Sequence, residues 1–321
     1  MKKKIIIISG DPNSINSEII AKCWKNFNNE LKKRIFIISN FNLLNQQFNK
    51  LGFAIKLEKV KDFNKETKSV NLKVIDLQLN FKNEFNVSKK NSSKFVIESL
   101  NLAHKLALRT DVCGLINCAI SKDLLNKSKI GVTEYLANKC NLNNNSEVMM
   151  IRNKIFSVSP ITTHIDIKDV PKQIKKRNII NKVKTINNWH KKKMNKKPKI
   201  GILGLNPHNA EYRKNSEEEK IISPSIKQLK KLKIDIHGPL VPDTIFMKDF
   251  KKFDVIIGMY HDQVLTPFKS LFKFDAINVT LGLKYLRASP DHGVAIDLIN
   301  KNKASSLSLL KCVNFINKFG K

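Results

Sequence analysis

The sequence predicts an α/β protein with a mainly parallel sheet, and three observations support this fold class. Short, continuous β-branched runs, such as residues 5–9, are typical of strands that are buried on both faces. These runs alternate along the chain with amphipathic segments of helical period, as in successive βαβ units. The chain has 321 residues, of which 41% are hydrophobic, so it can form two domains that each bury a core.

The first half of the chain is expected to contain three strands and three helices. A glycine turn at residues 10–14 separates the first strand from the first helix, and Ser92 or Ser93 supplies an N-cap for the third helix. Residues 54–90 show only short apolar segments, and no element is assigned there. In order, we expect a strand at 5–9, a helix from about 17, a strand at 34–39, a helix at 42–51, a helix at 92–109 and a strand at 112–120.

The second half begins with a predicted hairpin at 147–158 and a very basic helix at 174–193, whose lysines we interpret as a solvated face. Six of the eleven glycines fall between residues 200 and 297. Each is expected where the backbone needs positive φ or close approach, which marks this segment as the functional half. The remaining expected elements are a strand at 199–203, a helix at 226–232, strands at 254–259 and 276–280, and a helix at 305–319.

The net charge of +32 suggests a nucleic-acid-binding protein, but its origin argues against this class. The chain contains 53 Lys but only six Arg, together with 39 Ile and 37 Asn, as an AT-rich coding sequence favours. Proteins that read nucleic acids use the planar fork of Arg and interleaved aromatic rings, which here make up 7% of residues. Nucleic-acid binding is therefore a distant alternative, which steep salt dependence of duplex affinity would support.

Cysteine usage and the N-terminus predict a cytoplasmic protein. The five cysteines form no C-x-x-C pair and several lie in apolar runs, as expected of reduced, buried thiols. The N-terminus resembles a signal peptide, but its apolar run is short and Asp11 and Pro12 follow at once. No apolar stretch approaches the roughly 18 residues of a membrane span. We expect neither export nor a membrane partner.

Three histidines follow the carboxyl ends of predicted strands: His164 follows the hairpin, and His208 and His261 each follow a strand. Open α/β sheets bind ligands at that edge, and imidazole is a common metal ligand. Three protein ligands leave coordination positions open for substrate, as in catalytic metal sites. The alternative is three unrelated surface or capping histidines. His104 and His190 lie within predicted helices and are interpreted as structural.

A group of cationic and polar residues indicates an anionic ligand. Arg287 is one of only six Arg in a lysine-rich chain, which points to a bidentate carboxylate or phosphate partner, with a surface arginine as the alternative. Lys269 follows the third histidine, and Asn278 is placed to hydrogen-bond a ligand hydroxyl. Asp243 and Asp262 are candidates for a base or for capping roles. Neither G-x-x-x-x-G-K-[ST] nor G-x-G-x-x-G is present, so a nucleotide would bind without these fingerprints.

Seven segments together resemble the 4-hydroxythreonine-4-phosphate dehydrogenase family. They run in the family's order and extend over nearly the whole chain. The segments are GDPNSINSEI at 10–19, GVTEYLA at 131–137, TTHIDIKDV at 162–170, GLNPHNAE at 204–211, GPLVPDTIF at 238–246, YHDQVLTPFK at 260–269 and NVTLGLKYLRASPDHGVAIDLI at 278–299.

The resemblance implies a homodimer of subunits with two α/β/α domains of the isocitrate/isopropylmalate dehydrogenase type. The site is expected in the cleft between domains, at the subunit interface. We expect one domain to comprise residues 1–127 plus 294–321, and residues 128–293 to carry most of the metal and substrate site. The implied reaction is the NAD- or NADP-dependent, metal-assisted oxidation and decarboxylation of 4-phosphohydroxy-L-threonine to 3-amino-2-oxopropyl phosphate, in pyridoxal 5'-phosphate biosynthesis.

The resemblance also implies residue roles. The metal ligands fall on the three histidines His164, His208 and His261, and the ion is left open among Zn, Mg, Co and Mn. No general base and no cofactor-binding residue is assigned, and NAD is not distinguished from NADP. The substrate-binding positions of the family fall on Val132, Thr133, Lys269, Asn278 and Arg287.

Two departures from the family pattern lie on the substrate side. A G-H-T-E segment reads GVTE at 131–134, so Val132 replaces a histidine that contacts the substrate, and an Asn-Lys pair reads Ser121-Lys122. These departures leave an alternative open. The chain would then be a dehydrogenase of the same fold that acts on another phosphorylated hydroxy acid, such as threonate or erythronate 4-phosphate.

Overall fold

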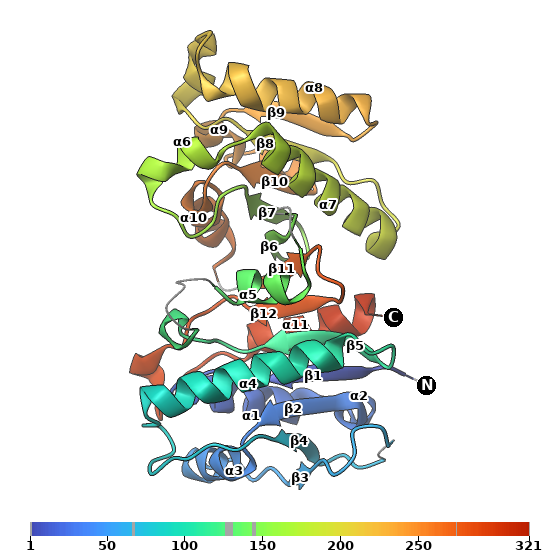
Figure 1. Cartoon of the computed structure of the whole chain (residues 1–321), viewed down its shortest axis with the longest axis vertical. Coiled ribbons are helices and arrows are strands. Elements are labelled where there is room, and N and C mark those ends of the chain that lie inside the picture. Colours follow the sequence, from blue (N-terminus) through green and yellow to red (C-terminus); the bar gives the residue numbers. More distant parts are fainter. Residues whose placement is uncertain (1, 66–67, 126–130, 143–145, 274, 321) are drawn as a thin grey trace. The chain divides into compact units, whose positions relative to one another are not determined.

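The computed structural model divides into two compact units (Figure 1). Unit 1 comprises Met1–Cys140 and Leu283–Lys321, and unit 2 comprises Asn141–Gly282. The structure describes all residues except 1, 66–67, 126–130, 143–145, 274 and 321. Both units consist of a sheet with packed helices, which confirms the α/β class predicted from the sequence.

Unit 1 is built on a parallel sheet. Its described strands are β1 (Lys4–Ile8), β2 (Ile35–Ser39), β3 (Leu57–Lys59), β4 (Leu72–Asp76), β5 (Val112–Asn117) and β12 (Arg287–Pro290). Their order is β3-β4-β2-β1-β5-β12, and every neighbouring pair is parallel. The central strands β1, β2 and β5 are buried almost throughout, which explains why their sequences are continuous apolar runs.

Helices cover both faces of the unit 1 sheet. The alternation of side chains along β5 shows this directly: Leu115 packs in one core cluster with Phe95, whereas a Cβ on Gly114 would meet Ile316. The described helices of unit 1 are α1 (Asn16–Asn26), α2 (Asn29–Arg34), α3 (Phe41–Lys50), α4 (Lys89–Ala107), α5 (Val132–Lys139) and α11 (Leu307–Phe319). Phe95 lies on α4 and Ile316 on α11, so these two helices lie on opposite faces.

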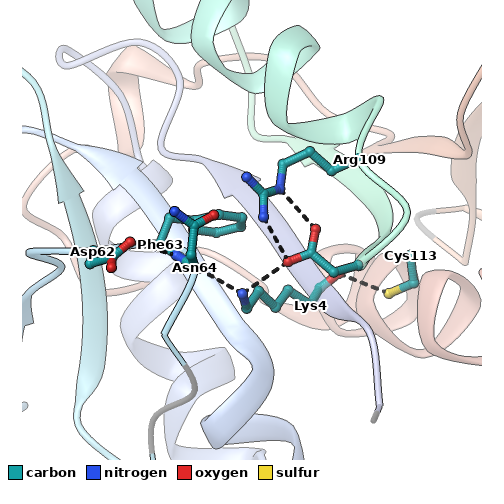
Figure 2. A network of polar contacts seen from close by, with 7 residues as sticks. Lys4, Asp62, Phe63, Asn64, Arg109 and Cys113 are labelled. Atoms are coloured by element: carbon teal, nitrogen blue, oxygen red, sulfur yellow. Dashed lines mark hydrogen bonds and ion pairs between the residues drawn. The ribbon is translucent and has the colours of Figure 1, made fainter.

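An ionic network lies at the amino-terminal ends of β1 and β5 (Figure 2). The Lys4 ammonium donates to the Phe63 carbonyl at 2.6 Å and to Asp111 at 3.0 Å, while the Arg109 guanidinium binds the same carboxylate through two hydrogen bonds. These partners hold the pKa of Asp111 at about 2, with the Arg109 hydrogen bond as the largest cause. Because α/β sheets bind ligands at the opposite edge, we assign this network to stability.

Unit 2 has a mixed sheet in the order β11-β6-β7-β10-β8-β9. Its described strands are β6 (Val148–Arg152), β7 (Ser157–Pro160), β8 (Ile200–Leu203), β9 (Ile236–Leu240), β10 (Val255–Gly258) and β11 (Ile277–Leu281). Strand β6 is antiparallel to both β11 and β7, whereas β7, β10, β8 and β9 are mutually parallel. The predicted hairpin is confirmed as β6–β7, and the Asn153 side chain accepts the backbone N–H groups of Ile155 and Phe156 in its turn.

The core of unit 2 is rich in phenylalanine. The Phe156 ring lies 5.2 Å from the Phe250 ring and 5.9 Å from the Phe268 ring, measured between centroids. Phe268 belongs to the helix that follows β10, so ring packing fixes this helix on the sheet. The described α-helices of unit 2 are α6 (Val170–Gln173), α7 (Lys176–Met194), α8 (Ser223–Lys231), α9 (Pro242–Ile245) and α10 (His261–Phe272).

Several elements were not expected from the sequence. Strands β3 and β4 lie within 54–90. Lys73 interrupts the apolar pattern of β4, and it can be buried there because carbonyl groups bind its ammonium group. Strand β9 contains Gly238 and Pro239, and α10 tolerates Pro267 in its interior. The expected N-cap at Ser92 or Ser93 is wrong: α4 begins at Lys89, and Ser88 caps it. Helices α2 and α5 and strand β12 were also missed, because they are short.

The cysteines match the expectation of reduced, buried thiols. All five cysteines are buried and none is in a disulfide. Within the described part of the chain, no helix combines the length and hydrophobicity that crossing a bilayer requires.

Candidate active site

The three candidate histidines follow three adjacent strands of unit 2. His164 follows β7, His261 begins the helix after β10, and His208 lies in the segment after β8. Strand β10 pairs in parallel with both β7 and β8, so the carboxyl ends of the three strands meet at one edge of the sheet. This is the edge at which α/β sheets bind ligands.

The structure brings His164 and His261 together. Their ring centroids are 5.6 Å apart, with an angle of 40° between the ring planes. The segment before His164 is fixed to the end of β10, because both the backbone N–H and the hydroxyl of Thr162 donate to the Met259 carbonyl. The Nδ1 atom of His261 lies 2.6 Å from an Asp262 carboxylate oxygen. Because this hydrogen bond engages Nδ1, the Nε2 atom of His261 is the ring nitrogen that a metal ion could bind.

His208 lies on an unusual left-handed turn. The φ angles of His208, Asn209, Ala210 and Glu211 are 48°, 56°, 56° and 49°, although none of these residues is glycine. A left-handed helical turn costs L-residues roughly 1–2 kcal/mol each. Such strain persists only where surrounding contacts hold it, and it concentrates at functional sites. The turn therefore makes the His208 segment a candidate functional segment independently of the histidine.

The third histidine is exposed and lies near an acidic residue. The Nε2 atom of His208 is 3.8 Å from an Asp243 carboxylate oxygen, and the two side chains are 69% and 61% exposed. Among the described residues, no three His, Cys, Asp or Glu side chains are arranged so that they would hold a metal ion. The donor set is chemically suited to a divalent cation, because it combines imidazoles with neighbouring carboxylates.

Gln263 ties two of the histidine segments together. Its side-chain oxygen accepts the backbone N–H of Met259 at 2.7 Å, and its Nε2 atom donates to the Gly204 carbonyl at 2.8 Å. It thus links the end of β10 to the chain just after β8. Gln263 was not predicted as a site residue, although it lies in the Y-H-D-Q segment.

Lys269 and Asn278 are the substrate candidates of unit 2. Lys269 is exposed on α10, about two helical turns after His261. Asn278 lies on β11, and its side-chain oxygen is buried with no hydrogen-bond partner among the described residues. A buried polar atom without a partner is costly, so Asn278 is suited to accept a hydrogen bond from a ligand.

Arg287 and Thr133, the candidates of unit 1, contact each other. The Arg287 side chain is buried, with its Nε donating to Asn117 Oδ1 at 2.8 Å and its Nη1 donating to Thr133 Oγ1 at 3.1 Å. Burial lowers the pKa of the Arg287 guanidinium to about 10, so it is still charged at neutral pH. Asn117 was not predicted, and its only sequence signal is a polar residue that ends an apolar run.

Val132 takes a structural position. It is the first residue of α5, directly before Thr133, and its side chain packs against the core cluster that contains Leu136. The apolar side chain at this position is therefore explained by packing.

The two units, with three histidines at the carboxyl edge of one sheet, define an α/β protein with a fold of the isocitrate dehydrogenase type. The chain is similar in fold to an isocitrate dehydrogenase from Methylococcus capsulatus, with a TM-score of 0.50 and 11% identity over 98% of this chain and 84% of that chain. Within this class, the chain belongs to the family described as pyridoxal phosphate biosynthetic protein PdxA, whose model matches residues 30–316. The resemblance inferred from the sequence and the isocitrate-dehydrogenase-like fold are both confirmed.

Relatives and solved structures agree with this family. The chain is 39% identical to the 4-hydroxythreonine-4-phosphate dehydrogenase of Sulfurihydrogenibium sp. (strain YO3AOP1), over 97% of this chain and 96% of the relative. It is 36% identical to the protein of that name from Aquifex aeolicus, over 98% of both chains. A structure of a putative enzyme of that name from Salmonella typhimurium matches with a TM-score of 0.85 and 26% identity, over 99% and 100% of the two chains. The chain is therefore an oxidoreductase of pyridoxal phosphate biosynthesis.

Proposed function

We propose that this enzyme oxidises and decarboxylates 4-phosphohydroxy-L-threonine to 3-amino-2-oxopropyl phosphate, with NAD or NADP as the acceptor and a divalent cation as a cofactor. One observation carries the proposal: three histidines follow the carboxyl ends of the adjacent strands β7, β10 and β8. The names of the relatives supply the substrate.

We assign the cation to His164, His208 and His261, and leave its identity open among Zn, Mg, Co and Mn. The Asp262 carboxylate orients the ring of His261 through its Nδ1 atom, and we assign the Nε2 atom to the cation. When bound, a divalent cation supplies Lewis-acid charge that favours loss of a proton from a hydroxyl group. No residue is assigned as the general base, and no residue is assigned to the nicotinamide cofactor.

We assign the substrate to Thr133, Lys269, Asn278 and Arg287. Arg287 binds an anionic group through a guanidinium that Asn117 and Thr133 already orient. Lys269 supplies a second positive charge, and the buried oxygen of Asn278 accepts a hydrogen bond from a hydroxyl or ammonium group. We further propose that the enzyme works in the cytoplasm as a homodimer with its sites at the subunit interface. Sedimentation at working concentration tests the dimer.

The decisive experiment measures NADH or NADPH formation with 4-phosphohydroxythreonine, using chelator-treated enzyme with and without added Zn²⁺, Mg²⁺, Co²⁺ or Mn²⁺. We expect turnover only with a divalent cation, while circular dichroism shows the fold intact in its absence. Full turnover in metal-free buffer would disprove the metal assignment.

A second candidate function is oxidation of threonate or erythronate 4-phosphate by the same machinery. Val132 favours it, because valine cannot hydrogen-bond a substrate as histidine does. Parallel assays with these compounds separate the two functions: the second is correct if one of them is turned over and 4-phosphohydroxythreonine is not.

A further inference from the structure

The His208 segment is anchored by one buried carboxylate. Glu218 is 1% exposed, and its Oε1 atom accepts the backbone N–H groups of Leu205 and Asn206 at 2.8 and 2.7 Å. Its Oε2 atom accepts the Asn206 side-chain amide at 3.0 Å. Hydrogen bonds to a carboxylate are about twice as strong as neutral ones. Glu218 therefore fixes the chain two residues before the left-handed turn.

The charge of Glu218 is stabilised by these contacts. Burial raises the pKa of the carboxyl group, but the hydrogen bonds from Asn206 and Leu205 outweigh burial and hold the pKa below its ordinary value. Glu218 is thus an anion at neutral pH although it is buried. Its partners include two backbone N–H groups and one side-chain amide of the loop.

The turn itself needs such an anchor. Four consecutive residues with positive φ are unfavourable for L-residues, so local preference cannot maintain the turn. The turn also depends on close packing at Gly204, where an added Cβ would lie 2.2 Å from the Asn209 side-chain oxygen and 3.1 Å from Glu218 Oε1. Asn209 is tied in turn to the Pro239 carbonyl at 3.0 Å. Glu218 is therefore the charged member of a cluster that encloses the base of the turn.

We propose that Glu218 is a positioning residue for the cation site: its carboxylate holds residues 204–211 in the left-handed turn and so orients His208. The inference rests on the proposed function, in which His208 is a ligand. It deepens that function, because the affinity of the site for a cation then depends on a residue that never touches the ion. Changes at such supporting positions typically weaken metal affinity 10- to 100-fold.

The test compares full-length wild type with Glu218→Gln, which keeps the size of the side chain but replaces one acceptor oxygen with an NH₂ group. Two quantities are measured: hydrogen exchange of the backbone amides of Leu205, Asn206 and His208 without metal, and Co²⁺ affinity by titration. We expect exchange at least about 10-fold faster and Co²⁺ affinity 10- to 100-fold weaker. At saturating metal, kcat is expected within about threefold of wild type, since the bound ion restores the turn.

A matched control is Glu217→Gln. Among the described residues, the Glu217 carboxylate accepts only the Asn206 side-chain amide, at 2.9 Å, and it contacts no backbone N–H of the loop. We expect changes below about threefold in both measurements. If Glu218→Gln does not fold, Glu218→Asp gives the same readouts with a shortened anchor.

The outcomes separate this inference from the proposed function. Unchanged amide exchange in Glu218→Gln, or unchanged Co²⁺ affinity, overturns the positioning role. A wild type that binds no Co²⁺ overturns the proposed metal chemistry, and with it the role of Glu218 toward a cation. In that case faster exchange would still show that Glu218 holds the turn. A loss of kcat at every metal concentration would indicate general damage and would also count against the inference.

Discussion

The two units hold their candidate site residues in opposite ways. In unit 1, Arg287 is 2% exposed and its guanidinium is bound by Asn117 and Thr133. In unit 2, the His208 side chain is 69% exposed and lies on a strained turn that depends on Glu218. The Arg287 guanidinium is already oriented, so it needs little rearrangement to bind an anion. The exposed His208 side chain is instead ordered by Glu218, which holds the backbone of its turn.

The largest expected effect lies in unit 2. His261→Ala removes a proposed ligand, so we expect cation affinity and kcat/KM to fall more than about 100-fold, beyond the cost of losing a supporting contact. The matched control is His237→Ala, because His237 is also partly exposed in unit 2 but pairs with Asp235. Metal titration and steady-state assays of both variants check this. Wild-type kinetics in His261→Ala would contradict the ligand assignment.

The next largest effect is expected at the buried Arg287 guanidinium of unit 1. Arg287→Ala removes a charge-assisted contact with the substrate, worth about 1.5–3 kcal/mol, so kcat/KM should fall roughly 10- to 150-fold. Asn117→Ala keeps the Arg287 guanidinium but removes one of the contacts that orient it, so we expect a smaller loss of kcat/KM. The KM for the nicotinamide should not change in either variant. Equal effects on substrate and cofactor would show that Arg287 supports the fold rather than the substrate.

A third prediction concerns another buried cation in unit 1 and its pH dependence. The Lys73 ammonium donates to the carbonyls of Lys32, Ser69 and Asn71, and burial lowers its pKa to about 8. In the unfolded chain the pKa is about 10.4. Between these values the unfolded state binds a proton that the folded state has released, so the free energy of unfolding rises with pH.

Urea unfolding at several pH values between 7.5 and 10.5 measures this contribution, with Lys73→Met as the reference. We expect the stability of wild type relative to Lys73→Met to increase between pH 8 and about 10.4, by up to about 1.4 kcal/mol per pH unit. If the difference in unfolding free energy between wild type and Lys73→Met does not change over this range, Lys73 keeps its proton. Burial would then lower the pKa of Lys73 less than we infer.

The smallest effect is expected at Val132. If the substrate is 4-phosphohydroxythreonine, Val132→His supplies one neutral hydrogen bond of about 0.5–1.5 kcal/mol, so kcat/KM should rise roughly 2- to 13-fold. Because Val132 packs on the core of unit 1, the variant should also unfold at a somewhat lower temperature. Cation affinity should not change. A loss of activity on the true substrate would instead support the alternative phosphorylated hydroxy acids.

The local sequence was sufficient for much of the fold. Strands β1, β2 and β5 were predicted because a strand buried on both faces is apolar throughout. Strand β4 was missed because Lys73 interrupts its apolar pattern, and one of the carbonyls that bind the Lys73 ammonium, that of Lys32, comes from a distant part of the chain. The helix α10 was missed because Pro267 is unfavourable inside a helix, and the packing of Val264, Leu265 and Phe268 in the core of unit 2 offsets its cost.

For the site, the sequence by itself determined which residue types follow which strands, because that depends on local patterns and on motifs that run in order. It also determined the family, since seven segments agree with it. Only the tertiary structure decided that β7, β10 and β8 are neighbours, that Asn117 and Thr133 hold Arg287, and that Glu218 anchors the turn of His208. The reason is physical: these contacts join residues 12 to 170 positions apart, and no local preference specifies such pairs.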